Sequence, residues 1–224
     1  MPHRVRRRGR AGLAALKLAA VAVAATAVGP TAATAQPPAA DPDWPCIQRL
    51  VPELSAGMIW TGPPPDGAAA TWRDDAAVRD LAAEIAARRT PLEEAERRVA
   101  EFADGLDPAA RDERLTMLFA GVLDTINRER SEIISGIKRF ARRQRALSGE
   151  IAEVNAALRE LEREEGGGTA EERAARRREI EERRDWSVRI FDEREGSLTY
   201  LCEQPVLLDQ RAFALAREIA AHLE

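Results

Sequence analysis

The sequence predicts an all-α protein: a small helical bundle with a long antiparallel coiled-coil hairpin, preceded by an irregular strap rich in Trp and Pro. Three observations predict this class. Apolar residues recur at helical spacing through most of residues 73–224, and helix-start signals precede several of these stretches. No run of alternating apolar and polar residues is long enough for a strand. Helix faces are therefore expected to bury one another.

Residues 1–35 have the layout of a secretory signal peptide. Five arginines come first, a mainly apolar run that contains Lys17 spans residues 13–28, and small residues at 33 and 35 predict cleavage between Ala35 and Gln36. The apolar run is shorter than the roughly 20 residues that cross a bilayer, which disfavours a retained anchor. Its position directly behind the arginines disfavours a nucleic-acid patch. The twin-arginine and general export routes both stay open.

Cleavage would change the net charge of the chain. The first 35 residues hold six of the 34 Lys and Arg and none of the 38 Asp and Glu, which leaves a formal charge of −10. An anionic chain is a poor ligand for nucleic acid. No second apolar stretch is long enough to insert into a membrane. We therefore expect a periplasmic or extracellular protein that binds no nucleic acid.

The two cysteines stand near opposite ends of the mature chain, at Cys46 and Cys202. An even number of cysteines in an exported protein predicts a disulfide, and only this pairing is possible within one chain. Two independent thiols are the alternative. A redox pair is disfavoured because there is no C-x-x-C motif, and a metal site because His222 is the only mature histidine.

Residues 36–72 form the predicted irregular segment, with three of the four tryptophans and the stretch GPPPDG at 62–67. Such a segment can serve as a Pro-rich ligand for a partner. Because Trp is usually buried and large enough to cover a seam, we favour a strap that lies over the helical core and is fastened by Cys46.

The helical domain is expected to span residues 73–224. A first helix presents Val78, Leu81 and Ile85 on one face. A second begins at TPLE, where Thr90 is predicted to form a capping box with Glu93, and Gly105 is its predicted C-cap.

A long helix is predicted from Pro108, with Asp107 as its cap, to the glycine triplet 166–168. Its polar stretch near Asn127 either fixes register or marks where the helix leaves the bundle, and we favour the second interpretation. Gly121, Gly136 and Gly149 are expected where a neighbouring helix comes close. The later part has residues at alternating steps of three and four, all apolar except Gln144, which predicts a heptad seam: Ile133, Ile137, Phe140, Gln144, Leu147, Ile151, Val154, Leu158 and Leu161.

A capping box at Thr169 and Glu172 starts the return helix, so residues 108–204 are expected to form a hairpin with its tip at 166–168. An intermolecular coiled coil is the competitor, and a homodimer stays open. Pro205 must either kink the return helix or start a new one. The last residues, including Leu208, Leu215 and Ile219, are expected to pack on the helices of 73–106.

The sequence carries no recognisable catalytic, cofactor or metal site. The mature serines lie in no nucleophile motif, and the one pair at metal-ligand spacing, Glu218 and His222, has no second histidine or cysteine near it. Lys138, the only mature lysine, is expected on a solvated face. We therefore expect no enzyme, no cofactor and no bound metal.

Three functional classes follow. The favoured one is an exported, non-catalytic helical protein that acts through protein–protein contacts as a scaffold, adaptor or assembly factor. The alternative is a periplasmic chaperone-like or stress-related protein that offers apolar surface to unfolded clients. A metal-binding or enzymatic module ranks third.

Overall fold

A computed structural model of the chain describes residues 41–163 and 168–224. The predicted signal peptide, its cleavage site at Ala35 and Gln36, and tip residues 164–167 lie outside these ranges. The described part holds six helices and no strand, and all six belong to one compact unit. They are α1 (Ala56–Ile59), α2 (Asp66–Thr71), α3 (Ala76–Ala86), α4 (Leu92–Asp104), α5 (Pro108–Arg163) and α6 (Ala170–Ala221).

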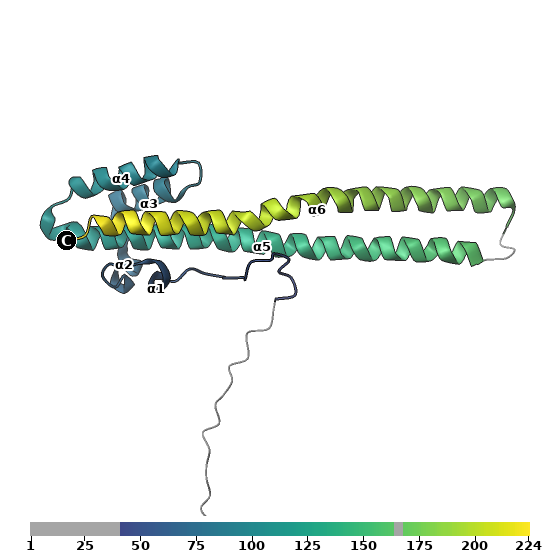
Figure 1. The fold of residues 1–224 in the computed structure, drawn as a ribbon, viewed down its shortest axis with the longest axis horizontal. Coiled ribbons are helices and arrows are strands. Elements are labelled where there is room, and N and C mark those ends of the chain that lie inside the picture. The colour runs from purple at the N-terminus through teal and green to yellow at the C-terminus, as the bar shows by residue number, and fades with distance from the viewer. Residues whose placement is uncertain (1–40, 164–167) are drawn as a thin grey trace, which may run out of the picture. The chain divides into compact units, whose positions relative to one another are not determined.

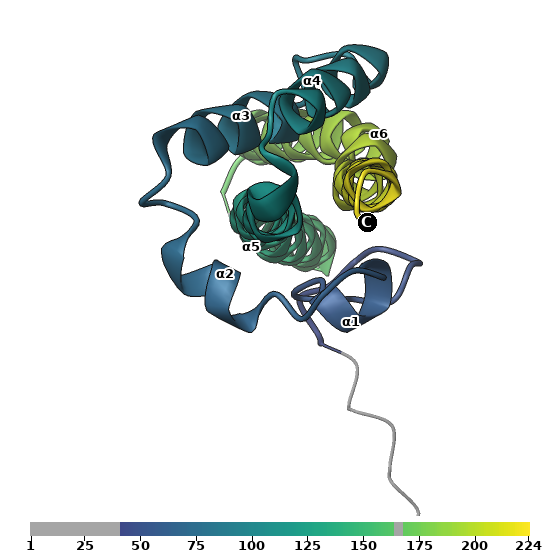
Figure 2. The same ribbon diagram turned by 90° about the vertical axis from the view of Figure 1, so that its left-hand side faces the viewer.

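The two long helices form the predicted antiparallel pair. α5 and α6 lie side by side along most of their length, and the shorter helices gather at one end (Figure 1). At a rise of about 1.5 Å per residue, 56 residues of α5 extend about 84 Å. Seen along the pair, α3 and α4 lie on one side of α5, and α1 and α2 lie on the other (Figure 2). We call this end of the hairpin the base.

The core of the base is a single cluster contributed by every helix except α2. Val78, Leu81 and Ile85 of α3 are buried in it, as predicted, together with Leu208, Leu215 and Ile219 of α6. From α5 the fully buried members of this cluster end at Ile126. The polar stretch that follows is therefore where the long helix leaves the bundle, as favoured from the sequence.

The ends of the long helices follow their capping signals. Asp107 accepts a hydrogen bond from the Ala109 amide (2.9 Å) where α5 begins at Pro108. Thr169 and Glu172 form both halves of the capping box that starts α6. Gly105 is the C-cap of α4, as predicted.

The capping box predicted at Thr90 is wrong. The Thr90 hydroxyl donates to the carbonyl of Glu84 (2.8 Å), near the end of α3, and Pro91 rather than Thr90 precedes α4. The hydroxyl therefore hydrogen-bonds to a carbonyl of the preceding helix instead of accepting a hydrogen bond from a backbone amide in the first turn of α4.

Pro205 does not start a new helix. α6 is continuous through it and bends where it reaches the base (Figure 1). A proline cannot donate to the carbonyl four residues earlier, so a kink is the expected result. Of the two predicted alternatives, a kink in the return helix or the start of a new helix, the kink is the one observed.

Two of the three glycine predictions for α5 are wrong. A Cβ atom on Gly121 would lie 2.8 Å from the Trp72 ring and 3.0 Å from Ala82, so close approach explains this glycine. Gly149 has open space around it, and Gly136 has only the end of the Arg139 side chain at 3.9 Å.

Candidate contact surface

Residues 41–72 form the strap, which is less irregular than predicted because it includes α1 and α2. Several of its larger apolar side chains pack on the base, whereas Ile47 and Met58 are exposed. Trp60 stacks on Phe119, with ring centroids 4.0 Å apart, and Trp72 is buried over Gly121. Leu54 and Ile59 are also buried. These contacts support the strap interpretation, which rested on the burial of its tryptophans.

The strap is fastened covalently by Cys46 and Cys202, which form the predicted disulfide with Cα atoms 5.6 Å apart. Beside it, the Gln48 amide donates to the carbonyl of Cys202. Cys202 lies on α6 just before Pro205. The bond was predictable because two cysteines allow only one intrachain disulfide.

The polar stretch of α5 holds the middle of the strap. Asn127 uses both ends of its amide on the backbone of Leu54, accepting from its N–H (2.9 Å) and donating to its C=O (2.8 Å). One turn later, Arg130 donates to the carbonyls of Val51 (3.0 Å) and Pro52 (3.3 Å). The break in the seam is therefore a binding site for the strap, a role that the sequence did not reveal.

Arg130 is also the most buried charge among the described residues, with 2% of its side chain exposed. Its Nε donates to a carboxylate oxygen of Asp209 on α6 at 2.5 Å. Burial raises the pKa of Asp209, although the charge and hydrogen bond of Arg130 oppose this effect. This pair joins α5, α6 and the strap at one point.

Ionic contacts hold the beginning of the strap along α5. Asp41 pairs with Lys138 (2.8 Å), and Asp43 pairs with Arg142 (2.7 Å) and Arg145. Lys138 is therefore not on a freely solvated face, contrary to the sequence-based expectation. Hydrogen bonds from these cations lower the pKa of both aspartates below the usual value.

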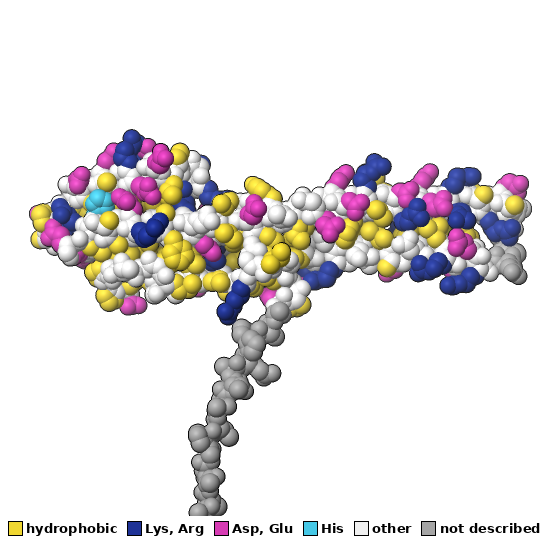
Figure 3. All heavy atoms as spheres, viewed as in Figure 1, with side chains coloured by type: hydrophobic (Ala, Val, Ile, Leu, Met, Phe, Trp, Pro, Cys, Tyr) yellow, Lys and Arg dark blue, Asp and Glu magenta, His cyan; other side chains and the backbone are white. Residues whose placement is uncertain are grey.

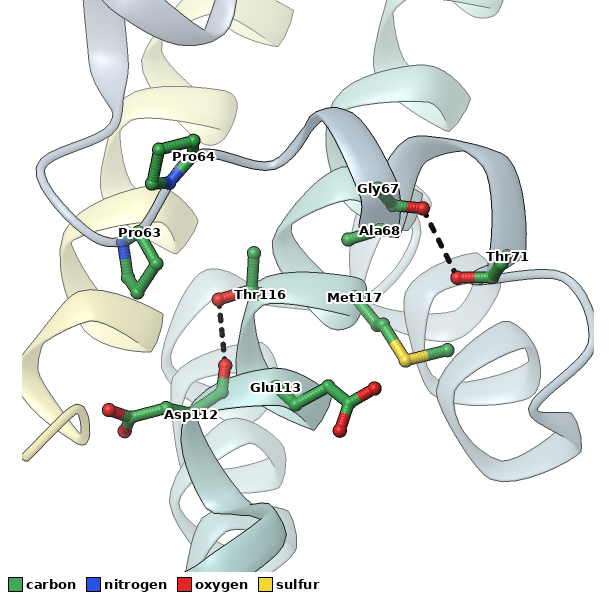
Figure 4. A pocket seen from close by; sticks show the side chains of 9 residues that line it. All are labelled: Pro63, Pro64, Gly67, Ala68, Thr71, Asp112, Glu113, Thr116 and Met117. Carbon is green, nitrogen blue, oxygen red and sulfur yellow. Dashed lines mark hydrogen bonds between the residues drawn. The ribbon is translucent and has the colours of Figure 1, made fainter.

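An open groove of about 500 Å³ lies between the Pro-rich loop and α5 (Figure 4). The hydroxyls of Thr116 and Thr71 in its wall each donate to a carbonyl of their own helix (2.7 and 3.3 Å). Asp112 and Glu113 are its only charged groups, and they are both acidic. The groove thus lacks the convergent donors and acceptors that orient a small molecule.

No group of three or more potential metal ligands occurs among the described residues. Glu218 and His222 meet at 3.1 Å across one helix turn, as their spacing predicts, and no third ligand joins them. In the same part of the chain, no helix has a stretch apolar enough to cross a bilayer.

Beyond the strap the hairpin arms are accompanied by no other described element (Figure 1). The inner faces pack as predicted near Leu147 and Val154, and Gln144 donates to the Phe191 carbonyl of the opposite arm (3.0 Å). Side chains of both charge signs cover the distal part of the arms (Figure 3). Ile134, which the predicted seam omitted, is buried, and together with strap residues it lines a small cavity.

Two large aromatic side chains point outward from α6. Trp186 is 63% exposed and Tyr200 is 65% exposed, although an aromatic residue in a predicted helix is usually expected on the buried face. A helical projection would have revealed this, because Trp186 lies about 140° from Phe191 at 3.6 residues per turn. These two residues are candidates for a contact surface because Trp and Tyr are enriched among the residues that contribute most to protein–protein binding.

The fold and these surfaces define the protein as an all-α helical hairpin with a disulfide-fastened strap and a small helical base. In comparisons with known proteins, no family model, no curated protein and no solved structure matches the chain.

Proposed function

We propose that this is an exported, non-catalytic protein that acts through protein–protein contacts made by its hairpin. The observation that carries the proposal is the uncovered outer face of α6, where Trp186 and Tyr200 stand more than half exposed on an otherwise charged surface. Trp and Tyr are enriched among the residues that supply most of the free energy of protein–protein binding.

Export is proposed from the signal-like residues 1–35 and from the disulfide. Disulfides form and persist in oxidising compartments, so the bonded pair Cys46–Cys202 fits a periplasmic or extracellular address. Intact mass of the protein from its native host tests this directly. A chain that begins at Gln36 and is two hydrogens lighter than its reduced form is expected, and a full-length chain with two free thiols would overturn the proposal.

A hairpin deletion tests the contact role. The contact between Gln144 and Phe191 sets the register of the arms, so Gly149 and Trp186 lie at the same height along them. Replacing residues 150–185 by a four-residue Gly/Ser linker, which spans up to about 14 Å, bridges helices about 10 Å apart. Because the removed part shares no core with the base, the base and its disulfide are expected to remain folded.

Affinity purification from the native host then compares the intact and shortened chains. The intact chain is expected to retain a second polypeptide, or a second copy of itself, that the shortened chain loses. Equal recovery from a shortened chain with an intact disulfide would exclude residues 150–185 as the contact surface. Because Trp186 and Tyr200 remain in the shortened chain, a full-length Trp186→Ala/Tyr200→Ala variant is compared as well, and equal recovery from it would exclude the outer face of α6.

The chaperone-like alternative requires a continuous apolar face. The other large exposed apolar side chains are distributed over the strap, α4 and the part of α6 in the base: Ile47, Met58, Leu92, Leu207 and Phe213. Strong binding of an apolar dye to the native protein, with slower aggregation of a model client, would favour that alternative.

A further inference from the structure

The outward face of the α6 arm is a stripe of residues at helical spacing, which we call the outer stripe. It consists of Ala175, Arg178, Glu182, Trp186, Arg189, Glu193, Gly196 and Tyr200, all exposed. Phe191 and Leu198, which are partly buried, lie on the opposite side of the helix, toward α5. The outer stripe is thus the face that the hairpin leaves uncovered.

Its four charged residues make no ion pair with any described residue. Neighbouring arginines do: Arg177 pairs with Glu162 (3.1 Å) and Glu181 (2.9 Å), and Arg184 pairs with Asp185 (2.7 Å). The charges of the outer stripe therefore remain available to a partner, and their order along the helix is basic, acidic, basic, acidic.

We infer that the outer stripe binds the outer stripe of a second copy of this chain, with the two α6 helices antiparallel. This inference rests on the proposed contact role of the hairpin and names its partner. A twofold axis between Asp185 and Trp186 brings every charge opposite its complement. Glu182 then faces Arg189 of the second copy, and Arg178 faces its Glu193. A parallel pairing would instead oppose like charges, which is unfavourable.

Three uncharged members of the stripe, Trp186, Ala175 and Gly196, fit the same arrangement, whereas Tyr200 falls opposite Glu171, beyond the end of the contact. The two Trp186 side chains flank the axis, where mutual burial removes their large apolar surfaces from water. Ala175 falls opposite Gly196 of the second copy, and a Cβ atom at Gly196 would meet nothing within 4 Å in the single chain. Small residues at both ends of the contact let the two helices approach closely.

The stripe from Ala175 to Gly196 is about 32 Å long at 1.5 Å per residue. One pair of helices of this length buries less than a standard interface, so the dimer is expected to dissociate at concentrations on the order of micromolar. Its contacts are exposed ion pairs beside two aromatics, so dissociation should increase with salt.

Charge exchange across the axis provides the test. Sedimentation equilibrium of the oxidised chain from residue 36 onward, at low salt, compares the unaltered protein with Glu182→Arg, Arg189→Glu and the double variant. Each single change places like charges together at two symmetric points and should weaken the dimer about tenfold. The double change restores opposite charges and should recover most of the affinity.

Matched controls and the aromatic variant complete the experiment. Arg194→Glu and Glu195→Arg alter exposed charges of the same helix off the stripe and should leave the dimer unchanged. Trp186→Ala should weaken it more than tenfold. Circular dichroism of each variant verifies that its helices are intact.

Three results would overturn the inference: a monomer at hundreds of micromolar at low salt, single variants that dimerise normally, or a double variant as weak as the singles. Capture of a different protein through Trp186 by a monomeric chain would also overturn it, while leaving the proposed contact role standing. A chain that neither self-associates nor captures another protein would overturn both the inference and the proposed contact role.

Discussion

Arg130 gives the sharpest test of how the strap and the hairpin are joined. Replacing it with Met keeps an apolar stem but leaves the Val51 carbonyl and the Asp209 carboxylate without their donor. Breaking one partner of a buried ion pair costs about 3–5 kcal/mol. Asp209 is 30% exposed, so water replaces part of the lost contact. We therefore expect a loss of about 3 kcal/mol in the free energy of unfolding.

Urea unfolding of the oxidised protein, followed by far-UV circular dichroism, measures this loss. The double variant Arg130→Met/Asp209→Leu should recover part of it, because no carboxylate is then left unpaired. In the single variant the loss should shrink as pH falls, since burial raises the pKa of Asp209 and the protonated carboxyl needs no cation. A loss below about 1 kcal/mol, or a double variant no better than the single one, would refute this account of the pair.

Three further predictions concern the strap and the glycines. Reducing the disulfide should lower the free energy of unfolding by at most about 5 kcal/mol, seen as a lower urea midpoint; an unchanged midpoint would contradict the loop-entropy argument. Gly121→Ala should destabilise the protein by about 1–3 kcal/mol because the added methyl group meets the Trp72 ring. Gly149→Ala should instead stabilise it by up to about 1 kcal/mol, because alanine is the better helix former and the space around residue 149 is open. Thermal unfolding measures both, and equal effects would be inconsistent with the packing. The lowered pKa values of Asp41 and Asp43 mean that their contribution is present above pH 3.8 and is lost as pH falls below it. The protection of amides at the start of the strap, measured against the free-chain exchange rate at each pH, should therefore fall there before that of the base.

Local signals in the sequence were enough to place the long helices. The caps at Asp107 and Thr169 act within three residues, and the heptad steps near Leu147 and Val154 reflect a single neighbouring arm. The disulfide was predictable for a different reason, since two cysteines allow only one intrachain bond.

Contacts between distant segments could not be read in this way. The partner of Asn127 is the backbone of Leu54, 73 residues earlier, and a backbone amide leaves no trace in residue identity. Thr90 looked like a cap because its alternative acceptor, the Glu84 carbonyl, becomes available only once α3 has ended. The outward position of Trp186 was within reach of a helical projection, but its partner depends on a surface outside the single chain.

The disulfide has a consequence for the order of synthesis. Cys46 leaves the ribosome 156 residues before Cys202, so for most of translation the only thiol it can meet belongs to another molecule. Once α6 is complete, the correct partner is also the only one in the same chain. Mispairing is thus restricted to cross-linking between molecules.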